Sequence, residues 1–364
     1  MRILILTGKF GMGHWSASCS LYDQLSTAFP DSEITVEDLP ALALPSASKS
    51  IYRGFYLLVN HGTSLYNFYY QATENGPFDV LPPLAPLLKK TLNNLLEKSK
   101  PDGIIATHPI CAQLVSRWKQ ETGSTLPLVT CITDLSPHAE WLCQGTDCYM
   151  AGSFDLRDAL MKKGIPKEKI LVSGIPVKNS FHATGSSKGG GPRRLLIMGG
   201  GMGVLPKRTR FYEELNQFPN LETTVMTANN KRLYEKFAGK FEHIEFLGYT
   251  DKVYDYMAQA DMVFTKPGGI TLFESIFSAL PMLAWEPFWE QEMHNADFLV
   301  AKDLGRVAPK ELDGSLESIR ALIYDTESLA RMSANMISLA AQLQNDGAAE
   351  LLASLTHGEL VRGR

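Results

Sequence analysis

Short, continuously apolar runs alternate with longer stretches of helical spacing along most of the chain. Continuous apolar runs are typical of parallel strands that are buried on both faces of a sheet. The strands predicted in this way are 2–7, 33–38, 103–108, 126–133, 147–152, 169–174, 193–200, 221–226, 243–248, 261–266 and 281–286. The pattern therefore predicts an α/β protein with doubly wound parallel sheets.

The stretches between these strands show the apolar period of amphipathic helices. The helices predicted in this way are 20–29, 86–99, 207–217, 229–239, 251–259, 269–279, 289–303, 311–323 and the alanine- and leucine-rich end, 327–356. One helix therefore follows most of the predicted strands, as a βαβ arrangement requires.

A stretch rich in glycine and serine, KNSFHATGSSKGGGP, divides this alternation into two halves. Such a composition without an apolar period is typical of a linker. We expect two Rossmann-like domains, 1–178 and 193–345, joined by a linker at 179–192 and facing a central cleft. The end of the chain, 346–364, is expected to form a helix that packs back on the first domain.

One segment, IYRGFYLLVNHGTSLYNFYYQ, interrupts the alternation at residues 51–71 with seven aromatic residues and Arg53 as its single formal charge. It has two interpretations. It is either a buried helical pair of the first domain or an exposed apolar surface for a membrane or an apolar substrate. In the second interpretation Tyr56 and Phe68 contact the acceptor or the membrane.

The composition is that of a globular protein, with 45% hydrophobic and 20% charged residues and a net charge of −4. Nucleic acid is therefore not expected as a partner. Five cysteines without the spacing of a metal site or a disulfide framework predict reduced thiols, no metal and a cytoplasmic location. The N-terminal MRILILTGKF reads as a strand and not as a signal peptide, and no apolar stretch is long enough to span a bilayer.

The motif TGKFGMGHWSAS joins the first predicted strand to a helix through Gly11 and Gly13. Glycines let a ligand approach the backbone, and a helix start offers free N–H groups with a positive dipole. Ser16 stands where a dinucleotide fingerprint would place its third glycine, which leaves a weak dinucleotide interpretation open. His14 favours another role, because a histidine at the mouth of the turn is well placed as a general base.

A second motif, CITDLSPHAEWL, places Asp134 and His138 just after the end of a predicted strand. Site residues in α/β sheets lie at this end of the strands. In the alternative interpretation Asp134 caps a turn and His138 is a surface residue.

The second half carries two glycine motifs. In LIMGGGMGVLPK a strand leads into a loop that contains Gly201, Met202 and Gly203, which has the composition of a phosphate-binding loop. In TKPGGITLFES, Gly268 and Gly269 precede a helix that starts near Ile270. The first N–H groups of that helix can bind a pyrophosphate.

Carboxylate and amide groups follow this helix start. Glu274, about one turn into the helix, can accept hydrogen bonds from both ribose hydroxyls. Gln291, Glu292 and Asn295 come after the next strand, and such groups suit the hydroxyls of a sugar. The second half is therefore predicted to hold a nucleotide-sugar, and the first half an acceptor.

Several ordered blocks carry a resemblance to a known family. They are LILTGKFGMGH, ITDLSPHAEW, LVSGIPVKNSF, LLIMGGGMGVL, LGYTDKVYDYMAQADMVFTKPGGITLFES and PMLAWEPFWEQEMHNADFL. From about residue 2 to about residue 340 the chain resembles the monogalactosyldiacylglycerol synthase and processive diacylglycerol glucosyltransferase family. It is more distantly similar to the lipid-linked N-acetylglucosaminyltransferase of peptidoglycan synthesis.

The resemblance implies a GT-B fold and an inverting, metal-independent transfer of a hexose from a UDP-sugar to a hydroxyl, most readily that of diacylglycerol. It implies that His14 is the base, that Asp134 supports it and that Trp141 lies near the acceptor, beside Gly11 and Gly13. The residues that it places on the donor are Leu247, Gly248 and Tyr249 for uracil, Gly268, Gly269 and Ile270 for the diphosphate, Glu274 for the ribose, and Gln291 and Glu292 for the sugar.

Two departures leave alternatives open. The family usually shows Pro-x-Pro-Gly-Gln-Glu before its sugar-binding acid, whereas Phe288, Trp289 and Glu290 stand here. The donor can thus be UDP-glucose, UDP-galactose or UDP-N-acetylglucosamine. Residues 1–178 carry sixteen basic and sixteen acidic residues, so attraction to the inner face of a membrane would be weak or local. A soluble natural-product or peptide acceptor, or a UDP-N-acetylglucosamine epimerase activity, is the alternative.

Overall fold

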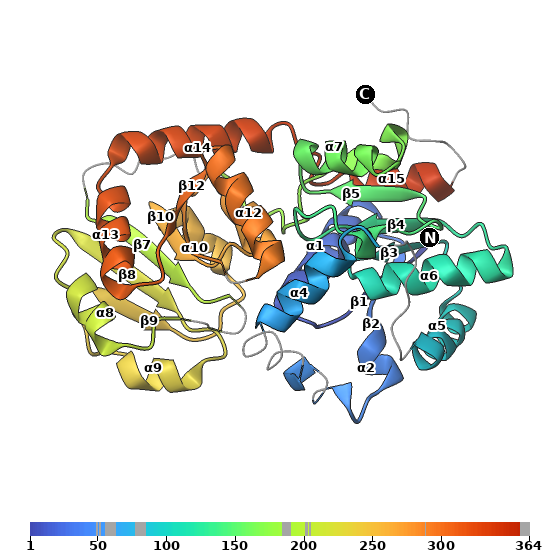
Figure 1. The fold of residues 1–364 in the computed structure, drawn as a ribbon, viewed down its shortest axis with the longest axis horizontal. Coiled ribbons are helices and arrows are strands. Elements are labelled where there is room, and N and C mark those ends of the chain that lie inside the picture. The colour runs from blue at the N-terminus through green and yellow to red at the C-terminus, as the bar shows by residue number, and fades with distance from the viewer. Residues whose placement is uncertain are drawn as a thin grey trace. The chain divides into compact units, whose positions relative to one another are not determined.

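The computed structural model describes residues 1–48, 50, 52–54, 63–76, 85–183, 191–200, 203, 205–287 and 289–356, without the side chains of 63–66 and 69. The chain forms two compact units. Unit 1 is Met1–Lys178 together with Leu343–Arg364, and unit 2 is Asn179–Gln342. Each unit is a layered α/β structure with its own sheet and its own covering helices (Figure 1).

Unit 1 is built on a six-stranded parallel sheet in the order β2-β1-β3-β4-β5-β6. Its strands are β1 (Arg2–Thr7), β2 (Glu33–Asp38), β3 (Gly103–Ala106), β4 (Leu128–Cys131), β5 (Cys148–Ala151) and β6 (Ile170–Val172). Its helices are α1 (Met12–Ala28), α2 (Leu39–Ala43), α4 (Thr63–Thr73), α5 (Ala85–Ser99), α6 (Pro109–Thr122), α7 (Phe154–Lys162) and α15 (Ala348–Thr356), with short 3-10 turns at Ala139–Trp141 and Lys167–Lys169.

The side chains of β1 show how this sheet is covered. Ile3 and Ile5 point to the face that α1 and α15 cover, where Leu352 joins the same buried cluster. Leu4 and Leu6 point to the opposite face and pack with α5 and α6. Because successive side chains of a strand alternate between faces, a continuous apolar run fits a strand that is covered on both sides.

Unit 2 has the same architecture, with a parallel sheet in the order β12-β11-β10-β7-β8-β9. Its strands are β7 (Arg193–Met198), β8 (Leu221–Met226), β9 (Ile244–Leu247), β10 (Met262–Thr265), β11 (Met282–Trp285) and β12 (Gly305–Ala308). Its helices are α8 (Thr209–Leu215), α9 (Lys231–Phe237), α10 (Val253–Gln259), α11 (Gly269–Phe277), α12 (Glu290–Ala301), α13 (Leu312–Ile323) and α14 (Thr326–Ala340).

The strand pattern differs from the sequence prediction at β12, which was not predicted. Gly305 of this strand lies so close to β11 that a Cβ atom would sit 1.9 Å from the backbone oxygen of Met282. A strand of four residues with a glycine and the exposed Arg306 lacks the continuous apolar run that marks the others. The predicted terminal helix over 327–356 is two helices, α14 in unit 2 and α15 in unit 1.

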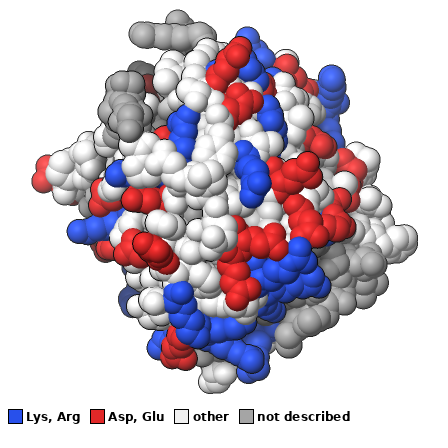
Figure 2. Space-filling view, turned by 90° about the vertical axis from the view of Figure 1, so that its left-hand side faces the viewer, with Lys and Arg blue, Asp and Glu red and all other residues white. Residues whose placement is uncertain are grey.

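The surface seen in Figure 2 belongs to the side of the molecule that lies at the left of Figure 1. Basic and acidic side chains are interspersed there, and neither sign covers the face. Among the described residues, no helix is both long and apolar enough to cross a bilayer.

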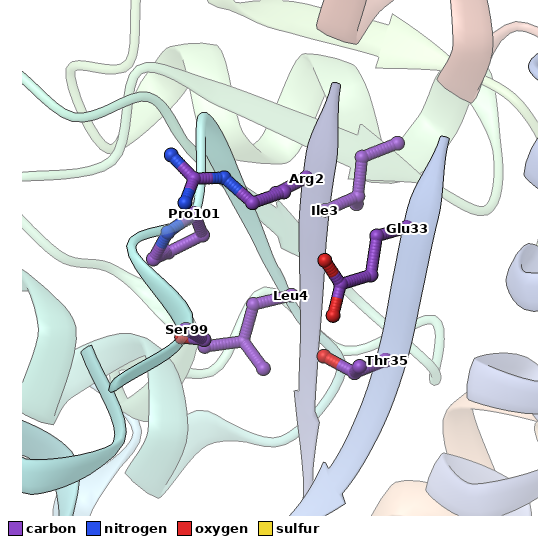
Figure 3. A pocket seen from close by; sticks show the side chains of 7 residues that line it. All are labelled: Arg2, Ile3, Leu4, Glu33, Thr35, Ser99 and Pro101. Atoms are coloured by element: carbon purple, nitrogen blue, oxygen red, sulfur yellow. The ribbon is translucent and has the colours of Figure 1, made fainter. Parts of the chain in front are cut away.

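A small depression lies at the amino end of β1 and β2 (Figure 3). Arg2, Glu33 and Ser99 are among its lining residues. Arg2 also donates its backbone N–H to the Asp102 carboxylate at 2.7 Å. Ligands of open α/β sheets bind at the opposite, carboxyl end of the strands, where the glycine motifs lie.

Candidate active site

The turn between β1 and α1 carries the first predicted group of site residues. Gly11 is exposed and has φ 107°, which only glycine adopts readily, and it precedes the first turn of α1. A Cβ atom built on Gly11 or on Gly13 would meet nothing within 4 Å. The backbone at these glycines therefore borders open space at the mouth of the turn, beside His14.

His14 is held by two neighbouring strands through one ring nitrogen. Its Nδ1 lies 2.9 Å from the backbone oxygen of Thr107, after β3, and 2.7 Å from Oγ1 of Thr133, after β4. A carbonyl oxygen can only accept a hydrogen bond, so the proton belongs on Nδ1. Nε2 then carries the lone pair, which is the state that a general base needs.

The surroundings also set the charge of this ring. His14 is half-buried, with its ring centroid 4.6 Å from that of His108 and 6.0 Å from that of Trp141. Burial lowers its pKa to about 4, although the hydrogen bond to Thr107 opposes this shift. The imidazole is therefore neutral at physiological pH and able to take a proton.

Asp134 lies close to this group and is 6% exposed. Its Oδ2 accepts a hydrogen bond from the indole Nε1 of Trp141 at 3.2 Å, and its Oδ1 accepts one from the backbone N–H of Ser136 at 3.0 Å. Trp141 has no exposed surface. Asp134 thus fixes the indole against which His14 packs, so Trp141 supports the base from the protein interior.

His138 is buried, with 1% of its surface exposed, so its alternative interpretation as a surface residue is wrong. Its Nδ1 accepts the backbone N–H of Glu140, so Nε2 carries the proton and donates to the backbone oxygen of Tyr70 at 2.9 Å. The ring also stacks on Tyr70 at 4.0 Å. His138 therefore attaches α4 to the strand end that carries Asp134.

The described side chains of the aromatic segment are divided between the core and the surface. Tyr70 on α4 is 2% exposed and belongs to the core, whereas Phe68 on the same helix is 70% exposed. Tyr56 lies outside the described residues. One face of α4 is thus held by His138, and an aromatic side chain projects from the helix into solvent.

A carboxyl group missed by the sequence analysis lies in the same motif. Burial and the nearby charge of Asp134 raise the pKa of Glu140 to about 8. Its Oε1 lies 3.8 Å from Nδ1 of His138. The raised pKa favours the neutral form of this carboxyl, which limits the negative charge next to Asp134.

In unit 2 the loop after β7 was predicted to bind phosphate. Gly201 and Met202 lie outside the described residues. Gly203 has φ 60°, and a Cβ atom there would sit 2.2 Å from the backbone oxygen of Thr227. Asn230 donates its Nδ2–H to the Gly203 oxygen at 2.9 Å. Gly203 is therefore needed for close packing of the loop against the end of β8.

Lys266, which the sequence analysis missed, lies in the TKPGG turn after β10. Its Nζ donates to Oε1 of Glu292 at 2.7 Å and lies 4.8 Å from the ring centroid of Trp289. A Cβ atom on Gly200, in the loop after β7, would lie 3.1 Å from Cε of Lys266. Because β7 and β10 are neighbours, the ammonium group lies between the two predicted phosphate loops.

The start of α11 follows directly. Gly268 caps the helix, and the N–H groups of Gly269 and Ile270 belong to the first turn, where no intrahelical acceptor exists. Glu274 is half-buried on the same helix. Free N–H groups at a helix start can bind a diphosphate, and a carboxylate on the same helix can accept hydrogen bonds from ribose hydroxyls.

The residues predicted to bind the donor sugar lie on α12. Glu292 is 6% exposed and bound to Lys266, and Gln291 is half-buried. Asn295 is 2% exposed and donates its Nδ2–H to the backbone oxygen of Pro267 at 2.9 Å. Asn295 therefore holds the turn that carries Lys266, in addition to any contact with a ligand.

The predicted uracil loop follows β9 at the same end of the sheet. The Leu247 oxygen accepts hydrogen bonds from the N–H and the hydroxyl of Thr227, both at 2.8 Å. Gly248 is half-buried, and Tyr249 is 73% exposed. The loop is thus fixed at its first residue and open at its last.

No cluster of histidine, cysteine and acidic side chains in the described part of the chain has the arrangement of a metal site. All five cysteines are free thiols, and Cys19 is the one among them that is not buried.

Comparisons with known proteins show what the chain is similar to. A family model described as monogalactosyldiacylglycerol (MGDG) synthase matches residues 14–177. A processive diacylglycerol beta-glucosyltransferase of Staphylococcus saprophyticus is 28% identical over 348 residues, which cover 92% of this chain and 88% of the relative. The chain is thus similar to processive diacylglycerol glucosyltransferases over most of its length, and to monogalactosyldiacylglycerol synthases over residues 14–177. It is a glycosyltransferase.

Solved structures show that the chain has the GT-B fold. MurG of Acinetobacter baumannii matches with a TM-score of 0.65 at 12% identity, covering 98% of this chain and 99% of MurG. A UDP-GlcNAc 2-epimerase of Neisseria meningitidis, bound to UDP-GlcNAc, matches with a TM-score of 0.60 at 13% identity, covering 99% of this chain and 100% of the epimerase. The fold is thus common to transferases and epimerases, and the family match distinguishes between them.

Proposed function

We propose that this glycosyltransferase moves a hexose from a UDP-sugar to the free hydroxyl of diacylglycerol or a related lipid, with inversion and without a metal. The observation that carries the proposal is the state of His14. Its Nδ1 proton is held by the Thr107 oxygen, and burial keeps the ring neutral, so Nε2 can accept the proton of an alcohol.

In this reaction Nε2 of His14 takes the proton as the acceptor oxygen attacks the anomeric carbon. The bond from that carbon to the diphosphate oxygen breaks, and UDP leaves with the electron pair. The growing negative charge is stabilised by the first N–H groups of α11 and by the ammonium of Lys266. A cationic side chain at this place lets the protein stabilise the leaving group through its own residues.

The ion pair between Lys266 and Glu292 links two parts of the donor. We infer that Glu292 and Gln291 bind hydroxyls of the hexose while Lys266 binds the diphosphate. Because Glu292 is almost fully buried, its carboxylate needs the nearby ammonium of Lys266 both with and without a bound donor. Glu274 is expected to bind the ribose, and the loop of Leu247, Gly248 and Tyr249 the uracil.

We further propose that the protein works from the cytoplasm at a membrane surface. Unit 1 carries the exposed Phe68 on α4, the helix that His138 attaches to the acceptor motif. An exposed aromatic side chain on a helix of unit 1 can insert into the lipid boundary without a net positive charge. This arrangement favours a lipid acceptor over a soluble one.

The test is a transfer assay with UDP-glucose, UDP-galactose and UDP-N-acetylglucosamine, with and without diacylglycerol in vesicles. We expect a glycolipid with inverted anomeric configuration, formed equally well after treatment with EDTA. His14→Ala should abolish transfer and leave UDP affinity nearly unchanged. Transfer to soluble acceptors alone, or interconversion of UDP-N-acetylglucosamine with its C2 epimer, would contradict the proposal.

A further inference from the structure

His108 lies beside the base and has no part in the mechanism above. It is 7% exposed and comes directly after β3, next to the residue whose carbonyl holds His14. Its ring packs between Phe10, at 5.2 Å, and His14, at 4.6 Å. Gly8 also lies against the ring, since a Cβ atom there would lie 3.4 Å from Cδ2, the carbon next to Nε2.

The tautomer of His108 is set by the start of α6. Its Nδ1 accepts the backbone N–H of Ile110 at 3.2 Å, as an N-cap does. The proton of the neutral ring therefore belongs on Nε2, and burial keeps the pKa of the ring well below its usual value. Among the described residues, no group accepts a hydrogen bond from this Nε2–H.

Two consecutive residues thus give the neighbouring rings opposite roles. The Thr107 oxygen directs the lone pair of His14 to Nε2, while the capping bond of His108 directs its proton to Nε2. One ring can accept a proton, and the other can donate a hydrogen bond, with ring centroids 4.6 Å apart. Such a pair suits a molecule with a hydroxyl and a second oxygen on adjacent carbon atoms.

We propose that His108 contacts the acceptor, donating its Nε2–H to the oxygen on the carbon next to the hydroxyl that His14 deprotonates. The inference rests on the proposed function. It specifies the acceptor as an alcohol with a vicinal oxygen, such as a glycerolipid whose free hydroxyl lies next to an acyl ester. The hydrogen bond orients the hydroxyl toward the donor and adds affinity for the acceptor.

The test compares two acceptors and two proteins. The acceptors are a short-chain 1,2-diacylglycerol and its analogue in which a methylene replaces the ester oxygen on C2. The proteins are the wild type and His108→Asn, in which the asparagine still caps α6 but does not extend as far as the imidazole Nε2. Acceptor kcat/KM, the Kd for UDP and the Tm are measured for each protein.

We expect the wild type to prefer the diacylglycerol by roughly three- to tenfold in kcat/KM, the effect of one neutral hydrogen bond. In His108→Asn this preference should disappear through a higher KM, with UDP affinity unchanged. The matched control is Ser153→Ala, which removes the N-cap of α7 in the same unit and should keep the preference. A purely structural role of His108 would lower the Tm and leave the preference intact.

A wild type that does not distinguish the two acceptors overturns the inference, and so does a preference that persists in His108→Asn. If the asparagine variant does not fold, His108→Asp keeps the cap without the N–H and is compared in the same way. A wild type that glycosylates neither lipid overturns the proposed function itself, which separates the two failures.

Discussion

The lowered pKa of His14 predicts a specific loss of stability in acid. In the unfolded chain a histidine has a pKa near 6.5, whereas burial lowers that of His14 to about 4 in the folded protein. Between these values the unfolded state binds more protons than the folded state. The free energy of unfolding therefore decreases as the pH falls through this window.

The size of the effect follows from the two values. Between pH 7.5 and pH 5, His14 should cost the folded state about 2 kcal/mol, a sizeable part of the roughly 5–15 kcal/mol that stabilises a domain. His14→Gln keeps a donor for the Thr107 oxygen and removes the titration. Between pH 7.5 and pH 5, the free energy of unfolding of the variant should therefore decrease by about 2 kcal/mol less than that of the wild type.

The assay is urea denaturation at half-unit steps of pH, followed by circular dichroism, with His14→Gln beside the wild type. The control is His243→Gln, which removes an exposed histidine from unit 2. Parallel curves for wild type and His14→Gln would refute the reasoning, because His14 would then bind protons equally well in both states. The pKa of His14 is measured directly from the NMR chemical shifts of its ring protons as a function of pH.

Four further predictions concern the nucleotide site and α4. Glu274→Ala should weaken UDP binding more than tenfold in calorimetry, by the loss of charge-assisted hydrogen bonds to ribose; unchanged affinity would remove Glu274 from the site. Lys266→Met should lower affinity for a UDP-sugar on the order of tenfold and leave affinity for uridine unchanged, since it removes one charge. Gly203→Ala should lower the Tm by several degrees, because it meets the Thr227 oxygen at a left-handed φ. Phe68→Ser should reduce sedimentation with vesicles at unchanged Tm; a large loss of Tm would show that Phe68 belongs to the core.

The sheets could be predicted from the sequence because parallel strands covered on both faces must be continuously apolar. β1, β2 and β8 have the predicted bounds, and the other predicted strands differ by one or two residues at one or both ends. β12 was not predicted, because it is an edge strand whose pairing depends on the absence of a side chain at Gly305. Close approach of two backbones leaves no apolar signal in the sequence.

The sequence predicted those site residues that stand within a single motif, but not the contacts between residues that are distant in the sequence. His14 and the TKPGG turn each follow a predicted strand, and the glycines next to them indicate a ligand-binding turn. Thr107 and Thr133 contribute a carbonyl and a hydroxyl from strands that neighbour one another only in the folded sheet. Lys266 stands in the TKPGG motif, but the sequence does not show its ion pair with Glu292. That ion pair depends on how α12 packs beside β10.

The path of the chain through the two units has a consequence for biosynthesis. Strand β1 of unit 1 comes early in the chain, yet Ala348, Leu351 and Leu352 of α15 pack in the same buried cluster as its Ile3 and Ile5. Unit 2, made of Asn179–Gln342, is translated completely before those residues exist. During synthesis, the face of the first sheet that α1 and α15 share therefore stays partly uncovered until after unit 2 has been made, and such exposed apolar surface is prone to aggregation.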